Sequence, residues 1–172
     1  MKKDKLEQRL TKSAYAYLDR YGSSVENLKF VLKRKTRRLI DKEDLEDLDV
    51  DGIVNRIADK CISLGIIDDA QYAQSKVAGL RRKGQSMRKI QAVLRAKGVS
   101  EAVAENALQS DDTDEVSAAR RYAQRRRLGA WRSDPTKRTD RRDKDIAALC
   151  RAGFAVSIAI KTIDCDADDE MD

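Results

Sequence analysis

The sequence predicts an all-α fold that consists of three tandem three-helix repeats in an elongated array. Turn-forming residues are scarce, with eight glycines and one proline in 172 residues, so the regularly spaced turns of an all-β fold are not expected. Three segments resemble one another, because each has a Tyr-Ala pair followed by a leucine at a matching place. Such self-similarity is typical of repeat proteins, whose units stack into extended surfaces. The tyrosines are Tyr15, Tyr72 and Tyr122, and the leucines are Leu32, Leu94 and Leu149.

Repeat one is expected over residues 1–65. Its Tyr-Ala pair is expected early in a first helix that stops at Gly22. Ser23 and Glu26 have the spacing of a capping box, which satisfies free N–H groups at a helix start, so the second helix is expected to begin there. Apolar residues then recur at helical spacing over residues 53–64, which predicts the third helix.

An acidic insert at residues 41–51 lies inside repeat one and is expected to make a solvated excursion. Within it, Asp47, Asp49, Asp51 and Gly52 match the start of a calcium-binding loop. The place of the bidentate carboxylate that completes such a loop is taken by an alanine. An acidic loop before a helix is therefore favoured over a calcium site.

Repeat two is expected over residues 66–110. Asp68 and Asp69 are expected to cap its first helix, because carboxylates accept hydrogen bonds from the free N–H groups of a first turn. Gly98 suits the left-handed position that ends the second helix, and Ser100 is expected to cap the third. A DNA-reading helix-turn-helix is not favoured, because that third helix has no Lys or Arg to reach a base edge.

Repeat three is expected over residues 111–163, with a loop at residues 130–140 that holds Trp131 and Pro135. The tryptophan is expected to anchor this loop to the body, and stacking on a base is the alternative. Gly153 is expected to end the second helix of the repeat.

Basic residues outnumber acidic ones, 36 to 30, although residues 164–172 form an acidic tail that is expected to be disordered. Guanidinium groups pair with two oxygens at once, so clustered arginines suit phosphates or an acidic protein surface. The candidate contact residues are Arg81, Arg82, Lys83, Arg88, Arg95, Arg120, Arg121, Arg127, Arg141 and Arg142. The residues assigned to packing are Tyr72, Ala73, Leu94, Leu149 and Phe154.

The composition argues against most enzyme chemistry. The chain has no histidine, which excludes histidine-dependent triads and most catalytic zinc sites. Its three cysteines form no CxxC pair and suit a reducing compartment, and Cys61 and Cys150 are expected in the core. No apolar run is long enough to span a bilayer, and the first residues lack the apolar segment of a signal peptide. We therefore expect a cytoplasmic, monomeric, non-enzymatic protein that needs no metal or cofactor and binds no membrane.

The segment from Ile66 to Leu108 resembles the central repeat of the RecX family, regulatory proteins of the RecA recombinase. The likeness rests on the Asp-Asp-x-x-Tyr-Ala opening, the basic residues before Gly84, and the Ile-x-x-x-Leu-Arg-x-Lys-Gly-Val ending. It extends over residues 14–163, with a departure in repeat one, where Thr36-Arg37 replaces the glycine and apolar residue of the other repeats. The resemblance implies an all-helical, curved array that binds the RecA nucleoprotein filament.

The resemblance also implies the activity. Such a protein inhibits the ATPase, strand-exchange and coprotease activities of RecA, modulates DNA repair and recombination, and meets single-stranded DNA through the filament. The arginines by themselves leave two other interpretations open. One is a sequence-nonspecific module for single-stranded DNA without a recombinase partner, and the other is a helical scaffold for an acidic protein.

Overall fold

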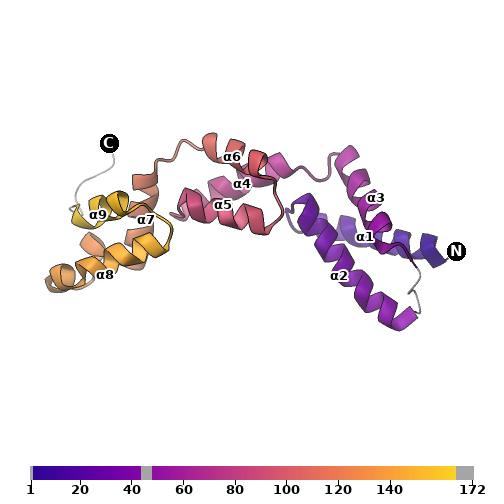
Figure 1. The fold of residues 1–172 in the computed structure, drawn as a ribbon, viewed down its shortest axis with the longest axis horizontal. Helices are drawn as coiled ribbons and strands as arrows, with labels where there is room; N and C mark the ends of the chain where they lie inside the picture. The colour runs from indigo at the N-terminus through magenta and orange to yellow at the C-terminus, as the bar shows by residue number, and fades with distance from the viewer. Residues whose placement is uncertain (1, 44–47, 166–172) are drawn as a thin grey trace. The chain divides into compact units, whose positions relative to one another are not determined.

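The described part of the chain is entirely helical. The computed structural model describes residues 2–43 and 48–165, and these residues hold nine α-helices and two short 3-10 helices without a β-strand. The predicted all-α class is therefore confirmed (Figure 1). The elements are α1 (Lys2–Leu18), α2 (Val25–Glu43), α3 (Val50–Ser63), α4 (Asp69–Arg82), α5 (Met87–Ala96), α6 (Glu101–Gln109), α7 (Glu115–Arg126), η1 (Gly129–Trp131), η2 (Pro135–Lys137), α8 (Arg138–Arg151) and α9 (Val156–Asp164). Within the described ranges, no helix is both long and apolar enough to cross a membrane.

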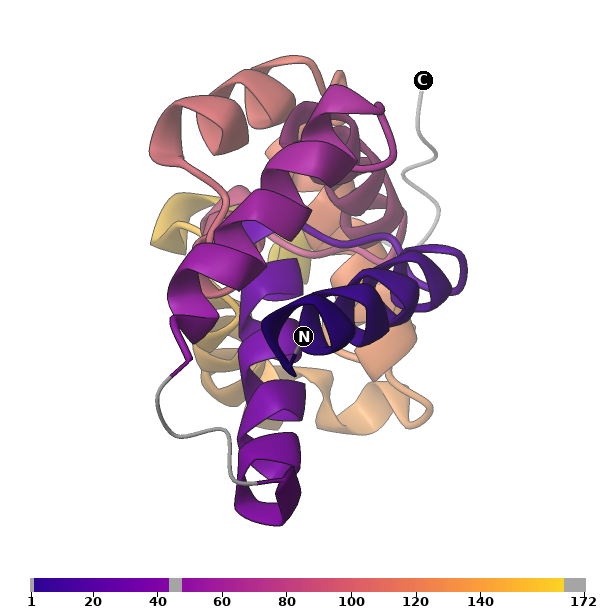
Figure 2. The same ribbon diagram turned by 90° about the vertical axis from the view of Figure 1, so that its right-hand side faces the viewer.

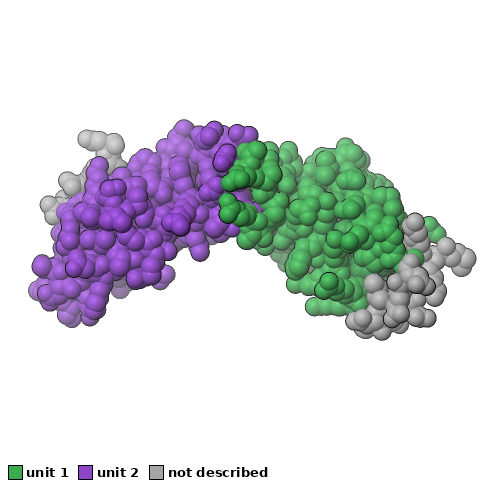
Figure 3. Space-filling model, viewed as in Figure 1, with its two compact units in different colours: residues 1–73, 95–103 green, residues 74–94, 104–172 purple. Residues whose placement is uncertain are grey.

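The chain divides into two compact units. Unit 1 consists of residues 1–73 and 95–103, and unit 2 consists of residues 74–94 and 104–172 (Figure 3). The division passes through α4, α5 and α6, so the compact units are not the three expected repeats. Each unit is therefore described by itself.

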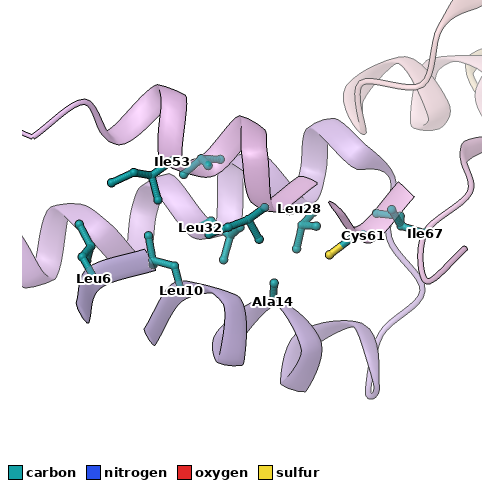
Figure 4. Packing of buried hydrophobic residues seen from close by; sticks show 10 residues of the cluster. Leu6, Leu10, Ala14, Leu28, Leu32, Ile53, Cys61 and Ile67 are labelled. Carbon is teal, nitrogen blue, oxygen red and sulfur yellow. The ribbon is translucent and has the colours of Figure 1, made fainter. Parts of the chain in front are cut away.

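The core of unit 1 is an apolar cluster shared by α1, α2 and α3. Leu6, Leu10 and Ala14 project from α1 towards residues of the other two helices (Figure 4), and Figure 2 shows α1 from its N-terminal end. From α2 come Leu28 and Leu32, both almost fully buried. Spacings of four residues keep these side chains on one face of each helix. The apolar residues from α3 are Ile53, Val54, Ile57 and Cys61.

Cys61 is fully buried, as predicted. Burial among apolar side chains raises the pKa of its thiol, because a low-polarity environment disfavours the charged thiolate. Cys150 is only half-buried, although it packs against the core of unit 2.

The start of α2 differs by one residue from the prediction. Ser24 caps the helix, because its hydroxyl oxygen accepts a hydrogen bond from the N–H of Asn27 at 3.2 Å. Ser24 also donates to the backbone carbonyl of Lys97. The predicted capping box is wrong, because Ser23 donates to a carbonyl and Glu26 pairs with a lysine instead. A buried serine that bonds two segments of unit 1 takes the capping position.

The predicted aspartate caps of α4 are borne out for one residue of the pair. Asp68 accepts hydrogen bonds from the N–H groups of Ala70 and Gln71 at 2.7 and 3.2 Å. Asp69 accepts one from the N–H of Val25 at 2.8 Å. It therefore satisfies the first turn of α2 and not its own helix.

Tyr15 lies late in α1, which begins at Lys2, so the expected early position of its Tyr-Ala pair is wrong. Tyr122 likewise lies late in α7. Only Tyr72 lies in the first turns of its helix. Tyr15 and Tyr122 therefore do not share the early helix position of Tyr72, whereas Leu32, Leu94 and Leu149 are all buried.

The two ends of the acidic insert are helical. α2 continues to Glu43 and α3 begins at Val50, so only a short part of residues 41–51 separates them. Asp49 caps α3 by accepting a hydrogen bond from the N–H of Gly52 at 2.8 Å. Asp47 and residues 166–172 of the acidic tail lie outside the described residues.

The expected loop at residues 130–140 is folded against unit 2. The segment is held by Asp145 of α8, a buried carboxylate. Asp145 accepts hydrogen bonds from the N–H of Gly129 at 2.9 Å and from Arg132 Nε and Nη2 at 3.1 and 2.5 Å. Because η1, η2 and the start of α8 at Arg138 together occupy most of the segment, little of it is irregular. Trp131 is half-buried within η1.

Asp114 caps α7 and makes the stability of the fold depend on pH. Its carboxylate accepts hydrogen bonds from the Ser117 hydroxyl at 2.5 Å and from the N–H groups of Ser117 and Val116 at 3.0 and 2.8 Å. The bond from the Ser117 hydroxyl, with those from the backbone, lowers the pKa of Asp114. Since the pKa is lowered on folding, this carboxylate stabilises the fold above the ordinary aspartate pKa, and the stabilisation is lost as the pH falls through the lowered value.

We expect Ser117→Ala to raise the pKa of Asp114 towards its ordinary value, because the alanine removes the hydroxyl donor. An NMR titration of the Asp114 carboxyl carbon measures this change. Ser110→Ala is the matched control, since the Ser110 hydroxyl donates to the carbonyl of Asn106 and not to Asp114. An unchanged Asp114 titration in Ser117→Ala would assign the lowered pKa to the backbone donors alone.

Candidate functional site

Arg81, a predicted contact residue, is buried inside unit 2 with 1% of its surface exposed. Its Nε donates to Asp111 Oδ1 at 3.1 Å, and its Nη1 donates to Glu115 Oε2 at 2.6 Å. Nη1 also donates to the carbonyl of Gln85 at 3.1 Å, and Nη2 donates to the carbonyl of Thr113. The prediction that Arg81 contacts a ligand is therefore wrong. Its guanidinium ties the end of α4 to the segment before α7.

The neighbouring basic residues of unit 2 do face solvent. Arg82 and Lys83 are exposed at the end of α4, and Arg88 is exposed in the first turn of α5. Arg95 belongs to unit 1, where it lies 3.6 Å from Glu101 in an exposed ion pair. Exposed pairs of this kind contribute little stability.

The predicted arginines of repeat three are in three different environments. Arg120 and Arg121 are half-buried along α7. Arg127 is exposed at the end of α7, with a left-handed φ of 54°. Arg141 is exposed as well. Arg142 is half-buried and forms a bidentate ion pair, because its Nε and Nη2 each donate to a carboxylate oxygen of Asp164 at 2.7 Å.

Three contacts hold the start of α5 against α7 and α8 within unit 2. The Ser86 hydroxyl donates to the carbonyl of Ala152 at 2.7 Å, and the N–H of Met87 donates to Glu115 Oε1 at 3.1 Å. Gly84, with a φ of +68°, places its backbone directly against that of α7. These contacts place the first turn of α5 beside the end of α8.

This arrangement forms a basic pocket with a volume of about 810 Å³ in unit 2. Its basic side chains come from three helices: Lys89 from α5, Arg125 and Arg126 from α7, and Arg151 from α8. No carboxylate is among the described residues that line it. We call these four residues, together with Tyr122, the basic pocket.

The ring of Tyr122 forms part of the pocket wall and is fixed from behind by Phe154. The two ring centroids are 5.9 Å apart at an interplanar angle of 63°, an edge-to-face arrangement that aromatic pairs favour. The guanidinium carbons of Arg125 and Arg126 each lie 5.8 Å from the Tyr122 centroid. Cations over an aromatic face are held there by the ring quadrupole. The pocket therefore presents positioned guanidinium groups that suit phosphate or carboxylate oxygens.

None of the four basic residues that line the pocket was among the contact residues predicted from the sequence. The sequence does show that Arg125 and Arg126 belong to a run of arginines. It gives no sign that Lys89 and Arg151 meet them, because the three helices come together only through tertiary packing.

The comparisons with known proteins agree on one family. The family model "RecX, second three-helix domain" matches residues 68–108. A protein of Myxococcus xanthus (strain DK1622) named Regulatory protein RecX is 40% identical over 159 residues, which cover 90% of this chain and 84% of that protein. A protein of the same name from Thermobifida fusca (strain YX) is 30% identical over 114 residues, which cover 66% of this chain and 60% of that protein. No solved structure gives a significant match. The likeness to the first relative runs over almost the whole length of the chain, and the family's second three-helix domain falls on α4 to α6. This chain therefore belongs to the RecX family of regulatory proteins.

Proposed function

We propose that this chain binds the nucleoprotein filament of a RecA recombinase and inhibits its ATPase, strand-exchange and coprotease activities. The observation that carries the proposal is the basic pocket, which is lined by four basic side chains and by the ring of Tyr122, with two of the guanidinium groups over that ring. The name of its relatives, Regulatory protein RecX, supports RecA as the partner. The exposed residues Arg82, Lys83, Arg88 and Arg127 of the same unit extend the proposed contact surface.

The physical basis is attraction to a negatively charged polymer. A filament on single-stranded DNA carries a regular series of phosphates, and each phosphate neutralised by an arginine or lysine releases condensed counterions. A regulator that prefers one arrangement of neighbouring filament subunits shifts the population towards that arrangement. Subunits held in this way complete the ATP-linked cycle less often, which lowers the ATPase rate.

The three-repeat organisation is part of the proposal. Three helical repeats over residues 1–65, 66–110 and 111–163 would offer several sites along such a filament. Contacts at several sites of one polymer raise the overall affinity, because later contacts form at a high effective concentration.

A reversal of charge in the basic pocket tests the proposal. We expect Arg125→Glu with Arg126→Glu to raise at least tenfold the concentration that halves RecA ATPase on single-stranded DNA, since charge-assisted hydrogen bonds contribute about 1.5–3 kcal/mol each. Lys144→Glu with Lys161→Glu is the matched control, because both lysines are exposed in unit 2 outside the pocket. Equal suppression by both double variants would remove the basic pocket from the proposal.

The rival interpretation, a DNA-binding module without a recombinase partner, makes a different prediction. Binding to bare and to RecA-coated single-stranded DNA is compared at two salt concentrations. Tighter binding to the coated strand at both concentrations supports the proposal. Equal binding to both strands, with no effect on RecA ATPase, would contradict it.

A further inference from the structure

A second surface, on unit 1, combines an exposed aromatic ring with arginines. Phe30 of α2 is 61% exposed, and the guanidinium carbon of Arg34, one turn later, lies 5.9 Å from its ring centroid. Arg37 and Arg38 are exposed on the following turn. We call these four residues the α2 outer face.

The helical repeat directs this face away from the core of unit 1. Leu28, Leu32 and Thr36 follow one another at four-residue spacing and are buried, and Figure 4 shows the two leucines among the residues of α1 and α3. At 100° per residue, Phe30 and Arg34 lie on the opposite side of the same helix. The phenyl ring therefore remains in solvent, where it is available to a ligand.

Two carboxylates of unit 1 are paired with lysines of α2. Glu26 lies 2.9 Å from the ammonium of Lys29, and Asp51 lies 2.9 Å from that of Lys33. Neither of these two carboxylates is paired with an arginine of the α2 outer face, and three arginines on one face create a positive field that suits an anionic ligand.

A second aromatic group lies at the end of α1 and in the segment that leads to α2. Tyr21 is 57% exposed, and its ring centroid is 5.4 Å from that of Tyr17. The hydroxyl oxygen of Tyr17 accepts a hydrogen bond from Asn27 Nδ2 at 2.9 Å, which ties the tyrosine pair to α2. Aromatic rings that alternate with cations are typical of surfaces that bind single-stranded nucleic acid.

We propose that the α2 outer face binds single-stranded nucleic acid directly, with Phe30 stacked on an unpaired base and the arginines paired with phosphates. A duplex does not fit this chemistry, because its base faces are already stacked. An acidic protein would pair with the arginines but would leave the phenyl ring without a flat partner. The inference goes beyond the proposed function, because this contact requires no recombinase.

The test measures binding of the full chain to fluorescently labelled oligo(dT), without RecA, by fluorescence anisotropy at low salt. We expect Phe30→Ala to weaken binding about 5- to 150-fold, the range that loss of one base–aromatic stack produces. Phe30→Trp is expected to retain the affinity, with quenching of the added indole fluorescence by oligo(dT). Val156→Ala is the control, since Val156 is an equally exposed apolar residue, 60%, in unit 2.

The arginines are tested through the salt dependence of the same binding. Arg34→Gln with Arg37→Gln is expected to reduce the slope of log affinity against log salt concentration by about 1.4, because each phosphate contact on a single strand contributes about 0.7. The control is Lys144→Gln with Lys161→Gln, which changes two exposed lysines of unit 2. This control is expected to leave the slope unchanged.

Three results would overturn the inference: no binding of oligo(dT) by the unaltered chain, unchanged affinity in Phe30→Ala, or an equal effect of Phe30→Ala on a duplex of the same length. Displacement of oligo(dT) by poly-glutamate with the same dependence on Phe30 would assign the face to an acidic protein. Suppression of RecA ATPase is measured separately with the same variants. Normal suppression beside a failed oligo(dT) test removes only this inference, whereas absent suppression by the unaltered chain removes only the proposed function.

Discussion

Replacing Arg81 by methionine is expected to lower the free energy of unfolding of unit 2 by about 3 kcal/mol. The methionine fills much of the same space but leaves the carboxylates of Asp111 and Glu115 without the guanidinium that they contact at 3.1 and 2.6 Å. A carboxylate that loses its partner inside a protein is costly, because water solvates it only in part. Urea unfolding followed by tryptophan fluorescence measures the effect, since Trp131 is the single tryptophan and lies in unit 2.

Two companion variants isolate the cause of that loss. Arg82→Met changes the exposed neighbour of Arg81 and is expected to alter stability by less than about 0.5 kcal/mol. Adding Glu115→Gln to Arg81→Met is expected to recover part of the loss, because it removes one unpaired charge. If Arg81→Met unfolds at the same urea concentration as the unaltered chain, the buried ion pairs contribute no net stability.

The second large effect is expected for Gly84→Ala, at about 2–5 kcal/mol of unit 2 stability. Gly84 has a φ of +68°, which L-residues with a side chain rarely adopt, and a Cβ atom there would lie 2.6 Å from the backbone nitrogen of Tyr122 and 2.8 Å from the carbonyl oxygen of Ala118. These neighbours are backbone atoms of α7, so they move only if the whole helix moves. The same urea unfolding experiment measures the loss.

Gly79→Ala is the matched control for this substitution. Gly79 lies inside α4, and nothing comes within 4 Å of the position that a Cβ would take. Alanine is expected to stabilise the helix by up to about 1 kcal/mol, because it loses less backbone entropy on folding. A similar loss of stability in both variants would contradict the assigned contact between Gly84 and α7.

The helices and the apolar core were predictable from the sequence because both depend on local periodicity. Leu32, Leu94 and Leu149 are buried as expected, and so is Phe154. The burial of Arg81 could also have been predicted, because Arg81 follows the apolar residues Ala73 and Val77 at four-residue spacing. All three residues are buried. The basic residues beside Arg81 concealed this signal, because a cluster of cations favours a solvent-exposed interpretation.

The basic pocket was not predictable, because its parts are distant in the sequence. Lys89 and Arg151 lie beside the arginines of α7 through tertiary packing, to which the hydrogen bond from Ser86 to the carbonyl of Ala152 contributes. No local pattern encodes that meeting. Similarly, Ser24 rather than Ser23 caps α2 because a carbonyl from a distant turn, that of Lys97, fixes its hydroxyl.

The burial of Cys61 gives the chain an internal reporter. An accessible thiolate attacks alkylating reagents as a nucleophile, and this thiol is fully enclosed in the core of unit 1 with a raised pKa. Its reaction therefore waits for unit 1 to open, so the rate of alkylation measures the free energy of that local opening. Trp131 gives the corresponding signal for unit 2, so each unit has its own native side chain that reports its opening.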